Sequence, residues 1–424
     1  MDPKQLSLFP VKTGGAGPLT AEQFHAGIIS FDRYGKKTNT LELSGPGYSV
    51  PVYVNEFWTS KQRAGHSLHE ISYRACFKPQ LPHFFITRLT GEGDVVYDPF
   101  MGRGTTIVES ALLQRVPVGC DINPLSRLLV SPRLDPPDAG GVQARLQAID
   151  LKKPQQIRDD LLVFYHPKTL RSITNLREYL LQREEKEKLD RIDHWIRMVA
   201  TNRLTGHSPG FFSVYTLPPN QAVSVDSQRK INEKRSQVPP YREIKAIILR
   251  KSRSLLRGLK RSETAVLRKA LSRARLITAS AERTPNIPES SVNLVVTSPP
   301  FLDVVDYQRD NWLRCWFNGI DSGSVDIWQL GKPEDWQKKM TAVFGELKRV
   351  LVPGGCIAFE VGEVRGGKIL LETLAVPAAL AAGLAAEAVI VNSQAFTKTA
   401  NCWGVDNLKK GTNTNRIVLL RKRG

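Results

Sequence analysis

The stretch from Asp94 to Pro124, DVVYDPFMGRGTTIVESALLQRVPVGCDINP, constrains the fold more than any other part of the chain. It predicts a strand over 94–98, a glycine loop, a helix with apolar residues at helical spacing, and a second strand over 116–121. This strand–helix–strand order is typical of a βαβ unit, in which the two strands run parallel. The chain therefore predicts an α/β fold with a parallel sheet.

The alternation of predicted strands and helices stops near residue 135 and resumes near residue 274. After the break, five further strands are predicted, in ARLITAS, VNLVVTS, GCIAFEVGE, EAVIVNSQAF and NRIVLLRK. Between the two parts, long charged stretches predict helices with solvated faces. We divide the chain accordingly into an N-terminal extension (1–76), a catalytic domain (77–134 and 273–424) and a basic, largely helical insertion (135–272).

Charge is the informative part of the composition. The chain has 60 Lys and Arg against 41 Asp and Glu, a net charge of +19. Residues 228–275 alone hold sixteen Lys and Arg against three Glu, so most of the excess lies in the insertion. This balance favours a polyanionic partner, most simply nucleic acid, although a basic surface without function remains an alternative.

Several function classes are disfavoured. No run approaches eighteen apolar residues, and the N-terminus does not resemble a signal peptide, so no membrane association is expected. The five cysteines are scattered singly, which argues against disulfides and a zinc site and fits a reducing cytosol. We expect a cytoplasmic prokaryotic protein associated with the nucleoid, with no metal.

The glycine loop DPFMGRGTT lies between a strand and a helix start, where glycines let a ligand approach the backbone. A dinucleotide fingerprint needs a third glycine, but Ile107 stands at that place, and a P-loop needs a lysine that is absent. An adenosine ligand without a pyrophosphate remains, S-adenosylmethionine above all. Asp98 is available for its ammonium group and Asp121 for its ribose. A purely structural turn is the alternative.

A second stretch, VVTSPPF, ends an apolar strand at two prolines. Proline has no N–H and cannot continue a sheet ladder, so the strand ends in a rigid corner. An aromatic ring, Phe301, follows directly. A structural strand end is the alternative to a functional corner.

Together, DPFMGRGTT, GCDINP and TSPPF resemble the amino-methyltransferases of DNA that use S-adenosylmethionine, in particular the N4-cytosine type. That type carries Ser-Pro-Pro and an aromatic residue, whereas the N6-adenine type usually has Asp or Asn in place of Ser298. The resemblance covers roughly residues 77–130 and 274–424. It implies a Rossmann-like methyltransferase fold with a seven-stranded, mostly parallel sheet.

The resemblance also implies the residues of the site. The cofactor-binding residues would be Phe77, Pro79, Asp98, Phe100, Gly102, Gly104, Thr105, Asp121, Ile122 and Ser280. The catalytic residues would be Ser298, Pro299, Pro300 and Phe301. The Ser298 hydroxyl and the Pro299 carbonyl would accept the two N–H groups of the exocyclic amine, and Phe301 would stack on the extruded base.

Two departures from the family pattern affect these expectations. The third motif usually carries Gly-Asp to bind the adenine, but Ala279-Ser280 stands there, so that Ser280 or Glu282 would have to substitute. The cofactor motif precedes the catalytic motif by about 200 residues, whereas many N4-cytosine enzymes have the reverse order. The insertion lies where a target-recognition region could sit.

Basic residues of the insertion are candidates for binding phosphates: Arg229, Lys230, Arg250, Lys251, Arg253 and Arg257. C5-cytosine chemistry is excluded, because none of the five cysteines follows a proline as that nucleophile normally does.

We therefore predict a site-specific methyltransferase that acts on cytosine N4 in double-stranded DNA, with a cognate restriction endonuclease as a candidate partner. The alternatives are an N6-adenine DNA methyltransferase, an RNA base amino-methyltransferase and a non-catalytic nucleic-acid-binding protein. The sequence determines neither the recognition site nor the oligomeric state.

Overall fold

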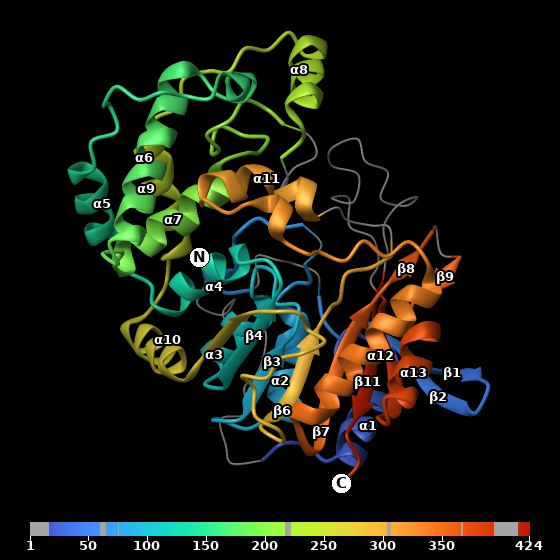
Figure 1. Ribbon diagram of the computed structural model, residues 1–424. Helices are drawn as coiled ribbons and strands as arrows, with labels where there is room; N and C mark the ends of the chain where they lie inside the picture. The colour runs from blue at the N-terminus through green and yellow to red at the C-terminus, as the bar shows by residue number, and fades with distance from the viewer. Residues whose placement is uncertain are drawn as a thin grey trace.

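A computed structural model describes residues 17–59, 65–74, 76–216, 222–302, 307–365, 368–393 and 414–424. Its centre is one sheet of nine strands in the order β1-β2-β10-β11-β7-β6-β3-β4-β5 (Figure 1). The strands are β1 (Asn39–Gly45), β2 (Tyr48–Asn55), β3 (Val95–Asp98), β4 (Val116–Asp121), β5 (Arg275–Thr278), β6 (Val292–Thr297), β7 (Leu351–Val361), β10 (Ala385–Ser393) and β11 (Thr414–Arg421). A separate two-stranded sheet pairs β8 (Glu363–Val364) with β9 (Ile369–Leu370).

The prediction of seven strands is wrong in its count. The seven strands from β3 to β11 in this sheet lie in the two predicted parts of the catalytic domain, and β11 alone among them runs antiparallel to its neighbours. The hairpin β1–β2 extends the sheet, because β2 pairs in parallel with β10. Val52 on β2 packs against Val389 and Val391 on β10, and this apolar contact covers an edge that would otherwise be open.

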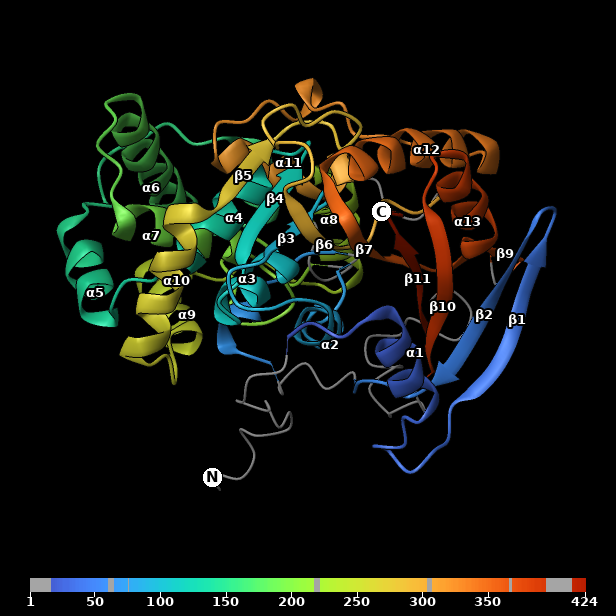
Figure 2. The ribbon, with the colours of Figure 1, turned by 90° about the horizontal axis from the view of Figure 1, so that it is seen from below.

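Helices cover both faces of the sheet, as the view from below shows (Figure 2). The long helix α12 and α13 lie on one face, while α1, α2, α3 and α10 lie on the other. None of the helices in the described ranges combines the length and the apolar character needed to cross a membrane. The helices outside the insertion are α1 (Ala21–Ile29), α2 (Gln80–Leu89), α3 (Thr105–Leu112), α4 (Leu125–Leu134), α11 (Tyr307–Phe317), α12 (Pro333–Val350) and α13 (Glu372–Ala381).

The insertion is helical, and its helices gather at one end of the molecule (Figure 1). They are α5 (Ala139–Ala148), α6 (Pro167–Glu185), α7 (Arg191–Arg203), α8 (Val225–Lys234), α9 (Ile244–Leu255) and α10 (Arg261–Arg273). Ile107 and Leu129 of the α/β part belong to the same apolar cluster as Trp195 of α7, so the two parts share a core. The last helix, α10, contacts α3, α4 and β4 and thus lies against the sheet. The domain boundaries themselves stay a prediction.

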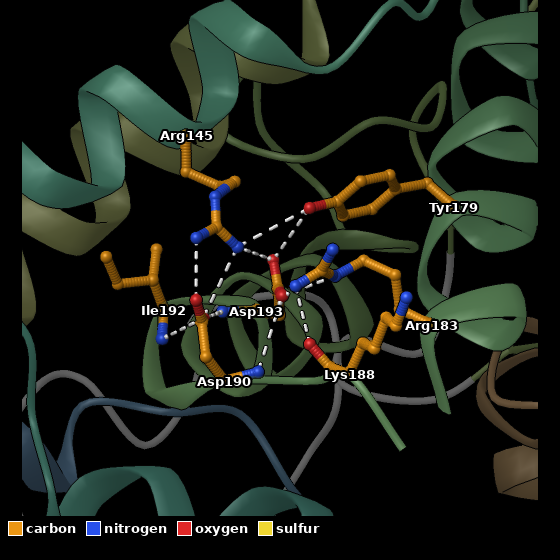
Figure 3. A network of polar contacts seen from close by, with 7 residues as sticks. All are labelled: Arg145, Tyr179, Arg183, Lys188, Asp190, Ile192 and Asp193. Atoms are coloured by element: carbon orange, nitrogen blue, oxygen red, sulfur yellow. Dashed lines mark hydrogen bonds and ion pairs between the residues drawn. The ribbon is translucent and has the colours of Figure 1, made fainter. Parts of the chain in front are cut away.

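Hydrogen bonds and ion pairs between charged side chains connect three helices of the insertion (Figure 3). The fully buried Asp193 on α7 accepts hydrogen bonds from Arg145 on α5 at 2.5 Å and from Arg183 on α6 at 2.8 Å. The Tyr179 hydroxyl donates a third hydrogen bond at 3.1 Å. Asp190 caps α7 and also pairs with Arg145. A buried carboxylate is tolerated here because two guanidinium groups neutralise it.

Candidate active site

A cleft opens at the carboxyl ends of β3, β4, β5 and β6. Its empty volume, counted out to the open mouth, is about 870 Å³. Four of the side chains that line it lie at or just beyond a strand end, namely Asp98, Asp121, Ser280 and Ser298. Because β4 and β5 extend to one side of β3 while β6 and β7 extend to the other, the cleft lies at the point where the strand order reverses. This is the usual ligand position in open α/β sheets.

Asp98 connects the two sequence motifs in space. It is the last residue of β3 and only 1% exposed. Its Oδ1 atom accepts a hydrogen bond of 2.7 Å from the hydroxyl of Thr297, the last residue of β6, and one of 3.1 Å from the Phe100 N–H. Burial outweighs these bonds and raises the pKa of Asp98 to about 7. The glycine loop and the Thr-Ser-Pro-Pro corner thus meet at Asp98, a buried carboxyl group whose charge is stabilised only by neutral hydrogen-bond donors in the described residues.

The glycine loop has the backbone shape that its sequence predicts. Gly102 and Gly104 have φ angles of +47° and +72°, which side chains disfavour. A Cβ atom at Gly104 would come within 2.3 Å of Val130 on α4, so glycine is also required there for packing. A Cβ atom at Gly102 would have room, since Tyr73 is 3.7 Å away, so that packing alone does not require this glycine. Gly104 therefore shapes the loop, and Gly102 faces the cleft.

Asp121, at the end of β4, holds the loop from the other side. Its Oδ2 atom accepts the Gly102 N–H and its Oδ1 atom accepts the Asn123 N–H, each at 2.8 Å. Burial raises its pKa, and the two backbone donors counteract the rise. The carboxylate lines the cleft next to Ile122, where the predicted ribose contact requires it.

An arginine that the sequence analysis did not single out ties the segment before α2 to the glycine loop. Arg103 is buried, and its guanidinium donates to the carbonyl oxygens of Ile71 at 3.0 Å and Phe77 at 3.1 Å. The Nε atom donates to Thr105 at 3.1 Å. Tyr73, Cys76 and Phe77 thereby form a wall of the cleft.

Ser298 faces a second buried carboxyl group. The register pairs Thr297 on β6 with Phe359 on β7, and the next residue of β7 is Glu360, which is 8% exposed. Burial raises the pKa of Glu360 to about 7, and hydrogen bonds from Asn415 and Ser298 limit the rise. An ionised carboxylate can only accept, so the Ser298 hydroxyl is the donor to the Glu360 carboxylate. The sequence analysis missed Glu360, because this contact depends on the pairing of β6 with β7.

The proline corner is held rigidly. The indole N–H of Trp336, a fully buried residue on α12, donates to the Pro300 carbonyl at 2.9 Å. Pro299 is buried, and Phe301 is half-buried against the apolar cluster beneath α12. The corner therefore has a fixed backbone and a partly exposed ring.

Ten of the fourteen predicted cofactor and catalytic residues line the cleft. They are Phe77, Asp98, Phe100, Gly102, Thr105, Asp121, Ile122, Ser280, Ser298 and Pro300. The other four do not line the cleft themselves: Gly104, Pro299 and Phe301 are next to lining residues in the chain, and Pro79 is two residues after Phe77. Pro79 precedes the first residue of α2. The assignment of roles to these residues stays a prediction.

Three lining residues come from a segment to which the sequence analysis gave no role. Asp326, Ile327 and Trp328 lie between η5 (Ser322–Ser324) and α12. A tryptophan in a polar, glycine- and serine-containing stretch was the available signal.

The predicted phosphate-binding residues occupy two separate places. Arg229 and Lys230 are exposed on α8, whereas the others lie on or just after α9, and the two helices are apart in both views (Figures 1 and 2). Lys251 is half-buried at 3.8 Å from Glu70, and burial lowers its pKa to about 8. Arg257 lies 3.6 Å from the same carboxylate. Arg250 and Arg253 are exposed.

Comparison with known proteins finds a family match for the part of the chain that carries the glycine loop. Residues 36–126, which include the glycine loop and Asp121, match the family of N6/N4 methyltransferases, described as DNA methylase. The match includes the hairpin β1–β2 and ends before the catalytic corner.

Two curated relatives are DNA-modification enzymes by name. The chain is 33% identical over 105 residues to the Type II methyltransferase M.MjaII of Methanocaldococcus jannaschii, which covers 24% of this chain and 17% of that protein. It is 28% identical over 148 residues to the Type II methyltransferase M.MvaI of Kocuria varians, which covers 34% of this chain and 29% of that protein. The matched segments thus span less than a third of either relative.

Solved structures resemble the chain more loosely. The rRNA methyltransferase AviRa of Streptomyces viridochromogenes overlays on 87% of this chain and 94% of its own at 14% identity, with a TM-score of 0.32.

Proposed function

We propose that the chain is a DNA methyltransferase that transfers a methyl group from S-adenosylmethionine to the exocyclic N4 amine of cytosine in double-stranded DNA. The observation that carries the proposal is the 2.7 Å hydrogen bond between Thr297 and Asp98, which brings the cofactor loop and the Ser-Pro-Pro-Phe corner to one cleft. The family match of residues 36–126 supports the broader class of amino-methyltransferases of DNA.

The residues of the cleft fit the proposed cofactor. Asp98 is a buried carboxyl group that has only neutral hydrogen-bond partners within the described ranges, and an ammonium group beside it would favour its ionised form. Asp121 and Ile122 would hold the ribose, and Gly102 lets the ligand approach the backbone. The cofactor supplies a methyl group on a sulfonium sulfur.

The corner would prepare the amine for attack. The exocyclic amine of cytosine is a poor nucleophile, because its lone pair is delocalised into the ring. The Ser298 hydroxyl donates a hydrogen bond to the ionised Glu360, so its oxygen lone pairs can accept an N–H of the amine. The Pro299 carbonyl would accept the second N–H, in a backbone that Trp336 holds at Pro300. Acceptors fixed in this way favour tetrahedral geometry at the nitrogen as the new bond forms.

The substrate would reach the cleft as an extruded base, since N4 cannot be methylated inside a stacked duplex. Phe301 is half-buried and next to the corner, and its ring would stack on the flipped cytosine. The basic insertion would bind the DNA phosphates through Arg229, Lys230 and the residues of α9, and other parts of it would select the target sequence. A restriction endonuclease of the same specificity would be a partner of such an enzyme.

Mass spectrometry of nucleosides from DNA incubated with protein and cofactor tests the reaction. We expect N4-methylcytosine from the wild type. Ser298→Ala should reduce turnover at least about a hundredfold and leave cofactor affinity within about twofold, because Ser298 contacts the base rather than the cofactor. Ser272→Ala, on the exposed face of α10, is the matched control and should have wild-type activity.

Each other result points to another function. N6-methyladenine would overturn the cytosine assignment and leave the amino-methyltransferase class intact. Preferential methylation of tRNA or rRNA in competition with duplex DNA would move the proposal to RNA. Failure to bind S-adenosylmethionine by calorimetry would favour a non-catalytic nucleic-acid-binding protein. A parallel loss of cofactor affinity in Ser298→Ala would contradict the role given to this serine.

A further inference from the structure

Among the described residues that line the cleft, none at the end of β5 is acidic, so an adenine amine there would lack a carboxylate acceptor. Ser280 lines the cleft there, but its hydroxyl is oriented only by a long contact of 3.4 Å to Glu282, so it can donate as well as accept and discriminates weakly. Glu282, the nearest carboxylate along the chain, does not line the cleft. Its two oxygens bind the Lys339 ammonium at 3.0 and 3.1 Å, and one of them also accepts from Ser280 at 3.4 Å. Glu282 is therefore engaged in an ion pair with Lys339 outside the cleft.

The segment before α12 brings a different carboxylate to the cleft. Asp326 lines the cleft and is exposed, and within the described ranges its side chain makes no salt bridge or hydrogen bond. Ile327 and Trp328 continue the same wall, so this stretch contributes an acidic group and two apolar side chains in succession.

Trp328 is held in place from both sides of the cleft. Its ring meets Phe100 of the glycine loop edge-to-face, with 6.0 Å between the centroids. The Lys339 ammonium lies 5.1 Å from the centre of the same ring, within the range of a cation–π contact. Since Lys339 also binds Glu282, one lysine ties Trp328 to the end of β5. The tryptophan thus contacts the glycine loop at Phe100, and through Lys339 and Glu282 it is connected to Ser280 on the wall of the same cleft.

We propose that Asp326 and Trp328 recognise the adenine of S-adenosylmethionine, in place of an acidic residue at the end of β5. The adenine amine is a donor, and a carboxylate is an acceptor that cannot donate when ionised, so Asp326 selects the 6-amino group. Trp328 supplies an aromatic wall for the purine ring. This inference rests on the proposed use of S-adenosylmethionine and deepens it.

Calorimetry with two ligands tests the inference on the full chain without a methylation reaction. One ligand is S-adenosylhomocysteine, and the other is its purine analogue, which carries hydrogen in place of the 6-amino group. We expect the wild type to bind the adenine ligand at least about tenfold more tightly, the range for a hydrogen bond to a charged group. In Asp326→Ala the two affinities should agree within about threefold, because the loss falls on the adenine ligand alone.

Matched variants separate this role from general effects. Asp335→Asn removes another exposed negative charge near the start of α12 and should keep the wild-type preference. Trp328→Ala should weaken both ligands by about tenfold, whereas Trp328→Phe, which keeps an aromatic ring, should restore most of the affinity.

The outcomes are distinguishable. If Asp326→Ala keeps the preference for the 6-amino group, or if Glu282→Gln abolishes it, the inference is wrong while the proposed function stands. If the wild type binds neither ligand, the proposed cofactor is wrong, and the inference fails with it.

Discussion

The insertion and the cleft both contain buried carboxyl groups, but the hydrogen-bond partners of these groups differ in charge. Asp193 in the insertion is fully buried and bonded to two guanidinium groups and a tyrosine hydroxyl (Figure 3). Asp98 in the cleft is equally buried, but its hydrogen-bond partners are neutral, namely two threonine hydroxyls and a backbone N–H. Glu360 resembles Asp98, with an amide and a serine as partners.

This difference separates structural charge from functional charge. Burying an ionised carboxylate without a cation costs free energy, and a protein avoids the cost by pairing the group or by leaving it protonated. The insertion pairs its carboxylate and gains rigidity between α5, α6 and α7. Asp98 in the cleft and Glu360, which contacts the cleft residue Ser298, have pKa values of about 7, so each can change its charge when a cationic or polar ligand arrives.

We expect the largest effect on stability at Asp193, whose buried negative charge is neutralised by two guanidinium groups. Asp193→Ala should lower the free energy of unfolding by about 3 kcal/mol, since removal of one partner from a buried network leaves the others unpaired. The exposed pair Arg158–Asp160 is the control, and Asp160→Ala should cost less than about 1 kcal/mol. Urea denaturation of both variants measures the difference. Equal and small losses would mean that the network of Figure 3 does not support the insertion.

In the cleft, neutralising a carboxyl group should impair binding and spare the fold. Asp98→Asn should weaken S-adenosylhomocysteine by about thirtyfold to a hundredfold, because the ammonium group loses a charge-assisted hydrogen bond. The apo variant should be no less stable at pH 8, since an amide avoids the cost of a buried negative charge. Calorimetry and thermal unfolding test the two statements. An unfolding loss as large as that of Asp193→Ala would make Asp98 a structural residue as well.

The smallest effect is a pH dependence. A cationic ligand prefers ionised Asp98, so affinity should rise about tenfold per unit as pH increases toward 7 and then level off. Titrations between pH 5.5 and 7.5 measure this slope. Asp98→Asn should remove the slope and Glu360→Gln should keep it, and the reverse pattern would assign the titration to Glu360.

The same two groups affect the stability of the free protein in the opposite direction. Their pKa values in the folded protein lie above the ordinary values of 3.8 and 4.5. They therefore stabilise the fold at low pH, and this contribution is lost as pH rises from about 4 to about 7. Saturating ligand should reduce the loss, because it compensates Asp98 in the folded state.

Local patterns predicted the strands that carry the site. The strand predicted over 116–121 is confirmed as β4, with Asp121 at its end, and the strand predicted before the glycine loop is confirmed as β3. The prolines end β6 at Thr297, as their missing N–H requires. These features depend on residues close together in the chain, and the periodicity of apolar side chains is sufficient to reveal them.

The strand count could not be predicted in the same way. The residues of β1 and β2 are mixed in character, and only their pairing with β10, more than 300 residues away, makes them part of the sheet. Likewise, α10 reads as a charged helix of the basic stretch, but it lies on the sheet because β5 follows it and must return beside β4. Long-range pairing decides these assignments.

The sequence by itself determined the chemistry at the strand ends, namely two carboxyl groups, a glycine loop and a proline corner. These residue types can be read from the sequence without a structure. The tertiary structure alone decided which further side chains meet them. Glu360 reaches Ser298 through the register of β7 with β6, and Trp328 reaches Phe100 from a loop more than 200 residues further along. The physical reason is that strand registers and packed loops bring distant residues together, and local sequence patterns carry no information about such contacts.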